Sequence, residues 1–301
     1  MIEYLKNDEI DRDKWDACIK NSHQLKPYGY SWYLDCMSPG WQALVDDDYD
    51  SVFPIPSRKK FGINYIATPI FLQQLGAFSP DKPSDEVLME FLQYLPEFYK
   101  LIDLYVAQRI ESDGFRVTEK YNFELDMARP YEELWKGFSS DCRRNISIAA
   151  RNKPELSSDI PPLELIDLFR NNTGFKMKGI KRLDYERLSN LMTYCIENNC
   201  GNITGVRASE GKLIFGLFSV KTKRSITLLF TANSSESREK RIGYYVVNEI
   251  IKENAATRTK IDFAGSSVPS IASFMESFGS VRVPYYRIYQ NRLFWPVKML
   301  K

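Results

Sequence analysis

Apolar residues recur along the chain at two spacings, one typical of strands and the other of helices. Apolar runs of strand length, bounded by turn residues, occur at Ser51–Ile55, Ile63–Ala67 and Leu101–Val106. Between residues 84 and 94, by contrast, the apolar side chains lie on one face of a predicted helix. The two patterns together predict an α/β (α+β) protein in which mixed, mostly antiparallel sheets are flanked by helices.

The predicted elements divide the chain into an N-terminal half at residues 1–127, a helical connection at 128–160 and a C-terminal half at 161–301. In the connection, a helix is predicted over Tyr131–Arg151 that breaks near Ser139, with Asp141 capping its second part. The N-terminal half is expected to hold a helix capped by Asp11 or Asp13, a helix at 84–94, a turn around residues 58–62, and strands at 2–5, 41–45, 51–55, 63–67, 101–106 and 121–125. The C-terminal half is expected to hold helices at 162–170, 184–198 and 269–278, a further helix after Gly243, and strands at 203–208, 213–221, 225–230, 260–263 and 281–289.

Composition excludes several classes of site. The chain of 301 residues has a net charge of +2, which gives no strong attraction to DNA or to anionic membranes. His23 is the only histidine and the five cysteines are scattered, so we expect no metal site and no covalently bound cofactor. No apolar run is long enough for a membrane span, and the first residues lack the apolar core of a signal peptide. We therefore expect a cytoplasmic protein with free thiols.

The segment Thr231–Asn254 carries the clearest candidate chemistry. A strand-like run is followed by a polar loop with three serines, a cluster of cations, and a glycine that opens an amphipathic helix. The first N–H groups of a helix have no partner within the helix and favour anions, and a glycine lets a phosphate approach the backbone. The predicted phosphate-binding residues are Arg238, Lys240, Arg241, Ile242, Gly243 and Tyr244. The alternative is an ordinary strand–loop–helix connection with a solvated basic loop.

Two further groups of residues are candidates for binding a substrate. Tyr30, Trp32 and Tyr33 belong to a dense run of aromatic residues, which either fill a core or line a ligand cleft. Arg143 and Arg144 fall in the first turn of a predicted helix, where positive charge opposes the helix dipole, so an anion, a carboxylate or solvent must accompany them. We predict that both groups line a cleft between the two halves.

The order of elements in the C-terminal half resembles the GNAT acyltransferase fold. In that fold a loop of the form Arg/Gln-x-x-Gly-x-Gly/Ala holds the pyrophosphate of coenzyme A at the start of the central helix. Here Arg238 matches the first position and Gly243 the last, while Arg241 replaces the first glycine. The resemblance implies an acyl-CoA cosubstrate and a catalytic strategy without a metal ion or a covalent intermediate.

Nearly the whole chain resembles the tandem relatives of that superfamily, the Fem-type peptidoglycan aminoacyltransferases and the bacterial acyltransferase-like proteins grouped with them. The residues that carry this resemblance are Tyr30–Tyr33, the segment from Glu133–Trp135 to Arg143–Ile146, and Asp262–Ser267. It implies two tandem GNAT-like halves and an amine acceptor, either a small molecule or a peptide-like group. A tRNA-borne donor is disfavoured by the small net charge and the lack of a basic tail.

Departures from the family pattern bear on catalysis. Many GNAT enzymes place a proton-donating tyrosine four residues before the glycine of the closing Gly-Phe pair, and here that position is Met275, which cannot donate a proton. Tyr285 and Tyr286, on the last predicted strand, are the candidates to replace it, although aromatic residues on a strand more often serve in packing. Three functions remain open: an N-acyltransferase that uses acyl-CoA, a Fem-type transferase that uses aminoacyl-tRNA, and a binding protein without catalysis.

Overall fold

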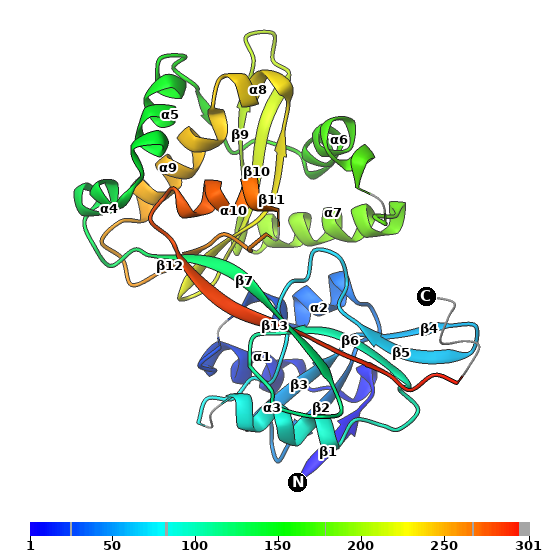
Figure 1. Ribbon diagram of the computed structural model, residues 1–301. Helices are drawn as coiled ribbons and strands as arrows, with labels where there is room; N and C mark the ends of the chain where they lie inside the picture. Colours follow the sequence, from blue (N-terminus) through cyan, green and yellow to red (C-terminus); the bar gives the residue numbers. More distant parts are fainter. Residues whose placement is uncertain (25, 82–83, 178, 267, 295–301) are drawn as a thin grey trace. The chain divides into compact units, whose positions relative to one another are not determined.

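The computed structural model describes residues 1–24, 26–81, 84–177, 179–266 and 268–294, which form two compact units (Figure 1). The first unit contains Met1–Lys120 and the segment that begins at Pro284, and the second contains Tyr121–Val283. The chain enters the second unit within strand β7 (Arg116–Asp126) and returns to the first within strand β13 (Val281–Asn291). The C-terminal end of β13 therefore belongs to the same unit as the N-terminus.

The first unit contains strands that pair mostly antiparallel. One sheet has the order β1-β2-β3, and β4, β5, β6 and β13 pair in that order elsewhere in the unit. Among the described strands of this unit, β5 and β6 pair in parallel, and an isolated parallel bridge joins Leu75 to Val106 on β6. The strands are β1 (Ile2–Leu5), β2 (Gln42–Asp46), β3 (Ser51–Ile55), β4 (Ser57–Lys60), β5 (Ile63–Ala67) and β6 (Leu101–Val106). The helices are α1 (Arg12–Asn21), α2 (Ser31–Met37) and α3 (Ser84–Gln93), with short 3-10 turns at Asn7–Glu9 and Pro27–Gly29.

Aromatic side chains fill the core of the first unit. The rings of Trp15 and Trp41 pack at a centroid distance of 4.6 Å, and both are fully buried. The indole N–H of Trp15 donates to the carbonyl oxygen of Gly29 at 2.8 Å, so burial leaves this polar group satisfied. Helix α1 begins as predicted, since Asp11 accepts hydrogen bonds from the amides of Asp13 and Lys14.

The second unit has a sheet with the strand order β7-β12-β11-β10-β9-β8. All of its described pairings are antiparallel except that of β11 with β12. The strands, apart from β7, are β8 (Leu156–Ser157), β9 (Gly201–Arg207), β10 (Leu213–Lys221), β11 (Ser225–Asn233) and β12 (Lys260–Asp262). The helices are α4 (Tyr131–Gly137), α5 (Ser140–Ala150), α6 (Pro162–Asn172), α7 (Arg182–Glu197), α8 (Ser235–Glu239), α9 (Ile242–Asn254) and α10 (Pro269–Glu276), and η3 (Gly174–Lys176) is a 3-10 turn.

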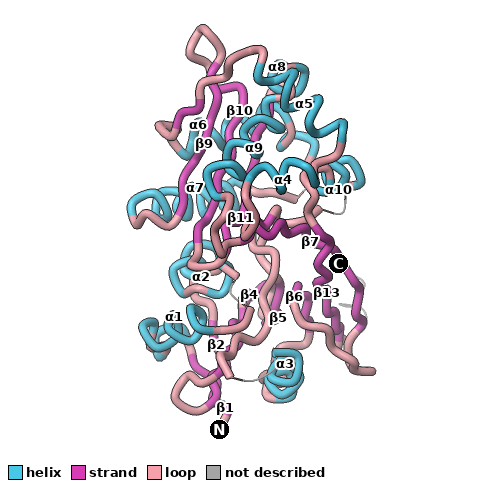
Figure 2. Tube along the Cα trace, turned by 90° about the vertical axis from the view of Figure 1, so that its left-hand side faces the viewer, coloured by secondary structure: helices cyan, strands magenta, loops and turns pink. Residues whose placement is uncertain are grey.

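Helices cover both faces of this sheet. Helices α5 and α9 pack against each other on one face, and α6 and α7 contact strands β9, β10 and β11 on the other (Figures 1 and 2). The apolar face of α9, with Val246, Val247 and Ile251, is buried in the main core of the unit. The N-terminus of α9 is thereby held beside the end of β11, because the short helix α8 alone connects them.

The fold class predicted from the sequence is confirmed, and three local predictions are corrected. The turn expected at residues 58–62 is shorter: residues 61 and 62 form it, whereas residues 58–60 belong to β4, which pairs with β5. The expected polar loop after β11 contains helix α8. Helix α5 is capped by Ser139, whose hydroxyl accepts from the amide of Cys142, and not by Asp141, which is already inside the helix. His23 is exposed and its amide donates to the carbonyl oxygen of Ser79.

Candidate functional site

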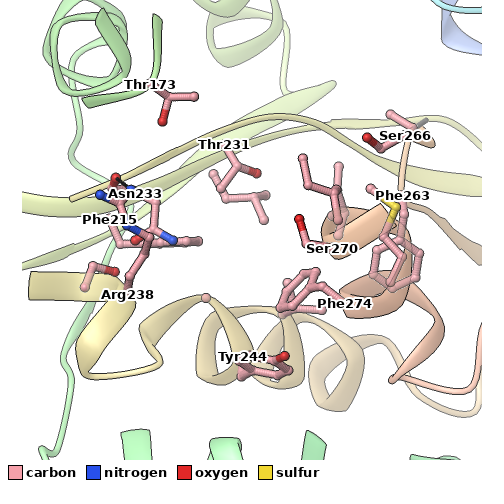
Figure 3. A pocket seen from close by; sticks show the side chains of 18 of the residues that line it. Thr173, Phe215, Thr231, Asn233, Arg238, Tyr244, Phe263, Ser266, Ser270 and Phe274 are labelled. Carbon is pink, nitrogen blue, oxygen red and sulfur yellow. Dashed lines mark hydrogen bonds between the residues drawn. The ribbon is translucent and has the colours of Figure 1, made fainter. Parts of the chain in front are cut away.

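A cavity of about 680 Å³ lies within the second unit, between strand β11 and helices α6, α9 and α10 (Figure 3). Most of its wall is apolar. The apolar lining residues are Phe169, Met177, Phe215, Leu217, Leu228, Leu229, Val247, Phe263, Ala264, Ile271, Phe274 and Met275. The polar and small ones are Thr173, Thr231, Asn233, Ser237, Arg238, Arg241, Gly243, Tyr244, Gly265, Ser266 and Ser270. A few polar groups in an apolar concavity of this size are typical of a small-molecule site.

The cavity lies where the parallel strands β11 and β12 diverge. The ladder between β11 and β12 joins Ser225–Thr227 to Lys260–Asp262, where β12 ends, whereas β11 continues to Asn233. Within β11, Leu229 is an extra residue, since Phe218 pairs with Phe230 and Ser219 pairs with Leu228. Such a bulge twists the strand and disturbs its ladder. In Figure 3, Thr231 lies on the strand between Thr173 on one side and Tyr244 on the other, so the cavity extends through this opening.

A buried carboxylate shapes one end of the cavity. Asp262 is almost fully buried at the end of β12, and its Oδ1 accepts from Nδ2 of Asn122 at 2.9 Å and from the amide of Ala264 at 2.8 Å. Ala264 and Gly265 both have left-handed backbone angles, with φ of 55° and 54°. This turn directs residues 263–266 along the cavity wall. Ser267, the last residue of the motif noted in the sequence, lies outside the described residues.

The opposite end of the cavity is positively charged. Arg238, on α8, donates from Nη1 to the carbonyl oxygen of Asn233 at 2.7 Å and keeps its exposed guanidinium beside the cavity. Arg241 is the N-cap of α9 and has a left-handed backbone, with φ of 61° and ψ of 25°, and its side chain makes no capping bond. Neither arginine forms an ion pair with an acidic group within the part of the chain that the structure describes. The amides that begin α9 add to this positive end.

Two buried polar atoms at this end have no hydrogen-bond partner among the described residues. They are the hydroxyl of Ser237, whose side chain is fully buried, and Oδ1 of Asn233. Figure 3 shows Asn233 beside Arg238 and Phe215, at the end of the cavity away from Ser266. A buried polar atom without a partner costs free energy, so it indicates a ligand or water at that position.

The predicted phosphate-binding residues separate into two groups. Arg238, Arg241, Gly243 and Tyr244 line the cavity. Lys240 is paired with Glu236 at 2.6 Å, and Ile242 is buried in the core. Neither is among the cavity-lining residues that the structure describes.

Two of the lining residues, Gly243 and Tyr244, lie in the first turn of α9. Gly243 faces the ring of Phe215, because a Cβ added to it would lie 3.3 Å from Cε2 of that ring. Tyr244 packs against Phe274 at a centroid distance of 4.7 Å. Burial raises the pKa of the Tyr244 hydroxyl, which therefore stays protonated at neutral pH.

The predicted substrate-binding residues lie in different units. In the first, Tyr33 is fully buried and its hydroxyl donates to the carbonyl oxygen of Phe71, whereas Tyr30 and Trp32 are partly exposed and stack at 5.6 Å. In the second, Arg143 donates to the carbonyl oxygens at the end of α4, including that of Phe138 at 2.8 Å. Arg144 forms an ion pair with Asp141, with 3.1 Å between Nη2 and Oδ1. A carboxylate was one of the partners expected for an arginine in the first turn of a helix. The role of these residues in binding stays a prediction.

The predicted proton donors, Tyr285 and Tyr286, are both buried on β13 in the first unit. Burial raises the pKa of Tyr285 to about 12, with a smaller contribution from Tyr105, so its hydroxyl remains protonated. Neither tyrosine is among the described residues that line the cavity, and their catalytic role stays a prediction. Met275, compared from the sequence with the tyrosine of many GNAT enzymes, does line it.

Several lining residues have no assigned role in the sequence analysis. Thr231, Asn233 and Ser237 belong to the candidate segment Thr231–Asn254, but their side chains are given no function there; the structure places the first two at the end of β11 and Ser237 on α8. The serine-rich loop was noticed, but its hydroxyls could not be placed, because the helix α8 was not expected. Thr173 and Met177 reach the cavity from the connection between α6 and α7, which carried no recognisable motif. Among the described residues no cluster of three or more histidine, cysteine or acidic side chains could hold a metal ion.

Comparison with known proteins places the chain by its fold. No family model matches the sequence, and the comparison with curated proteins found no match. Across the described residues no helix is both long and apolar enough to cross a membrane. Among solved structures, FemX aligns over 99% of this chain and 99% of its own, with a TM-score of 0.68 and 13% identity.

Two further solved structures give similar alignments. The C-terminal domain of a putative lysylphosphatidylglycerol synthetase from Agrobacterium fabrum covers 93% of this chain and 91% of its own, with a TM-score of 0.58 and 10% identity. A tandem GNAT protein from the clavulanic acid biosynthesis pathway covers 96% of this chain and 98% of its own, with a TM-score of 0.51 and 11% identity. The chain therefore has the fold of the tandem GNAT-like proteins, as the sequence predicted.

Proposed function

We propose that this protein transfers an acyl group from a phosphate-bearing donor, acyl-CoA in the first place, to an amine acceptor. The observation that carries the proposal is the cavity of the second unit, which has uncompensated arginines and the start of a helix at one end and splayed strands in its middle. Arg238 and Arg241 would hold the donor phosphates together with the first amides of α9. The unpartnered hydroxyl of Ser237 supplies a further hydrogen bond to the same group.

The chemistry follows from what the opening in the sheet offers. A neutral amine adds to the thioester carbonyl carbon, the oxygen becomes an oxyanion, and the carbon–sulfur bond breaks to give an amide and a thiolate. Backbone N–H groups of β11 beyond Thr227, near the bulge at Leu229, are suited to stabilise that oxyanion. The attacking amine loses a proton and the thiolate takes one up. Ser270, whose hydroxyl points into the cavity in Figure 3, is a donor for the second step, and Tyr285 and Tyr286 are the alternative donors.

The names of the structural neighbours support a transferase of the acyl or aminoacyl kind. One is a tandem GNAT protein solved without AcCoA, and another is part of a putative lysylphosphatidylglycerol synthetase. The first favours an acyl-CoA donor here, and the second an aminoacyl donor. The small net charge of +2 weighs against a tRNA-borne donor, whose backbone needs several cationic contacts.

One observation favours a second candidate, a binding protein without catalysis. Met275 lines the cavity at the position of the family's proton donor, and Arg241 stands where the family has a glycine. Both changes preserve a cavity while removing parts of the catalytic apparatus. Such a protein would bind the donor without turning it over.

Calorimetric titration of the purified protein with coenzyme A, acetyl-CoA and aminoacyl-tRNA distinguishes these functions. We expect coenzyme A to bind, and Arg238→Ala to weaken it by about tenfold or more, since one charge-assisted hydrogen bond contributes roughly 1.5–3 kcal/mol. Arg182→Ala is the matched control, because Arg182 is an exposed arginine of the same unit that is paired with Glu186 and is not among the described lining residues. Binding of aminoacyl-tRNA alone would favour the Fem-type function. Binding of coenzyme A without release of free thiol, with any amine offered, would favour the binding protein.

A further inference from the structure

We propose that the cavity binds a medium or long apolar acyl chain, so that the donor is an anionic amphiphile, a fatty acyl thioester, and not acetyl-CoA. This inference rests on the proposed function and specifies its substrate class. Three features carry it: the separation of charge from apolar wall, the exposed apolar rim, and the size of the cavity.

Charge is confined to one end of the cavity. Among its described lining residues the only ionisable side chains that carry charge at neutral pH are Arg238 and Arg241. The end away from them, around Phe263 and Ser266, has an apolar wall with isolated hydroxyl groups. A ligand with a negatively charged head and an uncharged chain matches this distribution, whereas a ligand charged at both ends would leave one charge buried without a partner.

The rim of the cavity exposes large apolar side chains. Met177, after η3, has 50% of its surface exposed, and Ile271, on α10, has 43%. Both line the cavity although they come from segments far apart in the sequence. An apolar chain lying between them would remove this surface from water, which is the main source of affinity for such a ligand.

The cavity is larger than an acetyl group requires. Its volume of about 680 Å³ falls within the range of roughly 300–1,000 Å³ that is typical of sites for drug-sized ligands. An acetyl group offers a single methyl carbon to an apolar wall that includes Leu228, Phe274 and Met275. A longer acyl chain displaces water from this wall, and each added methylene gains contact with it until the space is full.

The test is a titration series on the wild-type protein with coenzyme A and with acetyl-, butyryl-, hexanoyl-, octanoyl- and decanoyl-CoA. We expect affinity to rise by roughly twofold to fourfold per methylene and then to reach a plateau, because a buried methylene contributes about 0.8 kcal/mol at most. Equal affinity for acetyl- and decanoyl-CoA would overturn the acyl-chain proposal and leave the proposed function intact. If neither coenzyme A nor any acyl-CoA binds, the acyl-CoA function is wrong. Titration with octanoate then tests the acyl-chain site by itself, and absence of octanoate binding would overturn the acyl-chain proposal as well.

Substitutions of the two rim residues, Met177 and Ile271, test where the acyl chain binds. Met177→Ser and Ile271→Ser should each weaken octanoyl-CoA by about fivefold and leave unacylated coenzyme A unchanged, because each removes part of an apolar wall and no phosphate contact. Leu163→Ser is the matched control, since Leu163 is a large apolar residue of the same unit that is 65% exposed on α6 and does not line the cavity. Both rim residues are exposed, so their variants should fold, which far-UV circular dichroism verifies. Unchanged octanoyl-CoA binding in both would overturn the placement of the chain.

Discussion

Gly243 faces Phe215 across the wall of the cavity, and a Cβ on the glycine would lie only 3.3 Å from Cε2 of the ring. The glycine therefore permits the start of α9 to approach strand β10 closely. The sequence alone attributes this glycine to the close approach of a phosphate. The geometry adds a second reason, the packing of the helix against the aromatic ring.

Gly243→Val should lower the free energy of unfolding by about 1–3 kcal/mol, because the branched side chain overpacks the space that Phe215 occupies. Gly243→Ala should have a smaller effect, since the ring needs to move only a few tenths of an ångström and alanine favours the helix by about 1 kcal/mol. Urea denaturation of the three proteins measures both values. Phe215→Leu combined with Gly243→Val should recover part of the loss, and strictly additive effects would contradict the packing explanation.

Two substitutions of Arg241 distinguish the effect of its backbone conformation on stability from the effect of its charge on ligand binding. Its left-handed backbone costs a non-glycine residue about 1–2 kcal/mol, while a glycine loses roughly 0.5–1 kcal/mol more conformational entropy on folding. Arg241→Gly should therefore stabilise the protein by about 0.5–1 kcal/mol and weaken coenzyme A by about tenfold. Arg241→Ala should weaken binding equally without the gain in stability. Thermal denaturation and calorimetry check the two effects separately.

A contrary result for Arg241→Gly would be informative. If the glycine variant binds coenzyme A and the wild type does not, the arginine side chain occupies the phosphate position itself. The acyl-CoA function would then be wrong for the natural sequence, although the fold would stand. Arg238→Ala, which keeps Arg241, should not restore binding in that case.

Asp262 should be among the polar residues that matter most for the stability of the second unit. Its carboxylate accepts two hydrogen bonds in a buried position, from Asn122 and from the amide of Ala264. Asp262→Ala removes both and leaves their donors buried, so we expect a loss of about 2–4 kcal/mol, measured by urea denaturation. Asp126→Ala is a suitable control, because the exposed Asp126 also accepts one amide bond, from Ala128 at 3.0 Å. Losses of equal size would show that burial contributes nothing.

The sequence predicted most elements because their apolar periodicity is strong. Strand Leu213–Lys221 and strand Ser225–Asn233 lie at or near their expected positions, and the helix after Gly243 packs its apolar face as foreseen. The strand β4 was missed because its residues, Ser57–Lys60, are polar and acquire their place only by pairing with β5. Helix α8 was missed for a similar reason, since Ser235–Glu239 is too short and too polar to show a period.

The candidate site was predictable only where it depends on local sequence. The cation Arg238 and the helix start at Gly243 could be recognised from their spacing in one segment. The rest of the wall comes from three other segments that meet only through the sheet, including Thr173, Phe215 and Phe263. The spacing of residues in the sequence does not predict that these segments come together. The ion pair between Lys240 and Glu236 is local in sequence, since its partners are four residues apart. It could not be predicted because it depends on helix α8, which brings residues at this spacing together.

Cys142 should make the stability of the second unit depend on pH in the alkaline range. Its side chain is fully buried, and burial raises the pKa of the thiol from 9.0 to about 11. The folded protein then holds this proton more tightly than the unfolded chain does. The stabilising contribution is complete below about pH 9 and is lost as the pH rises towards and through about 11.

The measurement is the free energy of unfolding at pH 8 and pH 10, in urea, for the wild type and for Cys142→Ala. Between these values the thiol of Cys142 should account for about 1 kcal/mol of lost stability, because one group contributes at most about 1.4 kcal/mol per pH unit. Cys142→Ala is expected to be less stable at pH 8, through its small cavity, but to lose about 1 kcal/mol less between the two pH values. Cys200→Ala is the control of opposite sign: the side chain of Cys195 lowers the pKa of the Cys200 thiol by hydrogen bonding, so this variant should not flatten the dependence. Parallel curves for wild type and Cys142→Ala would show that the buried thiol ionises as freely in the folded protein as in the unfolded chain.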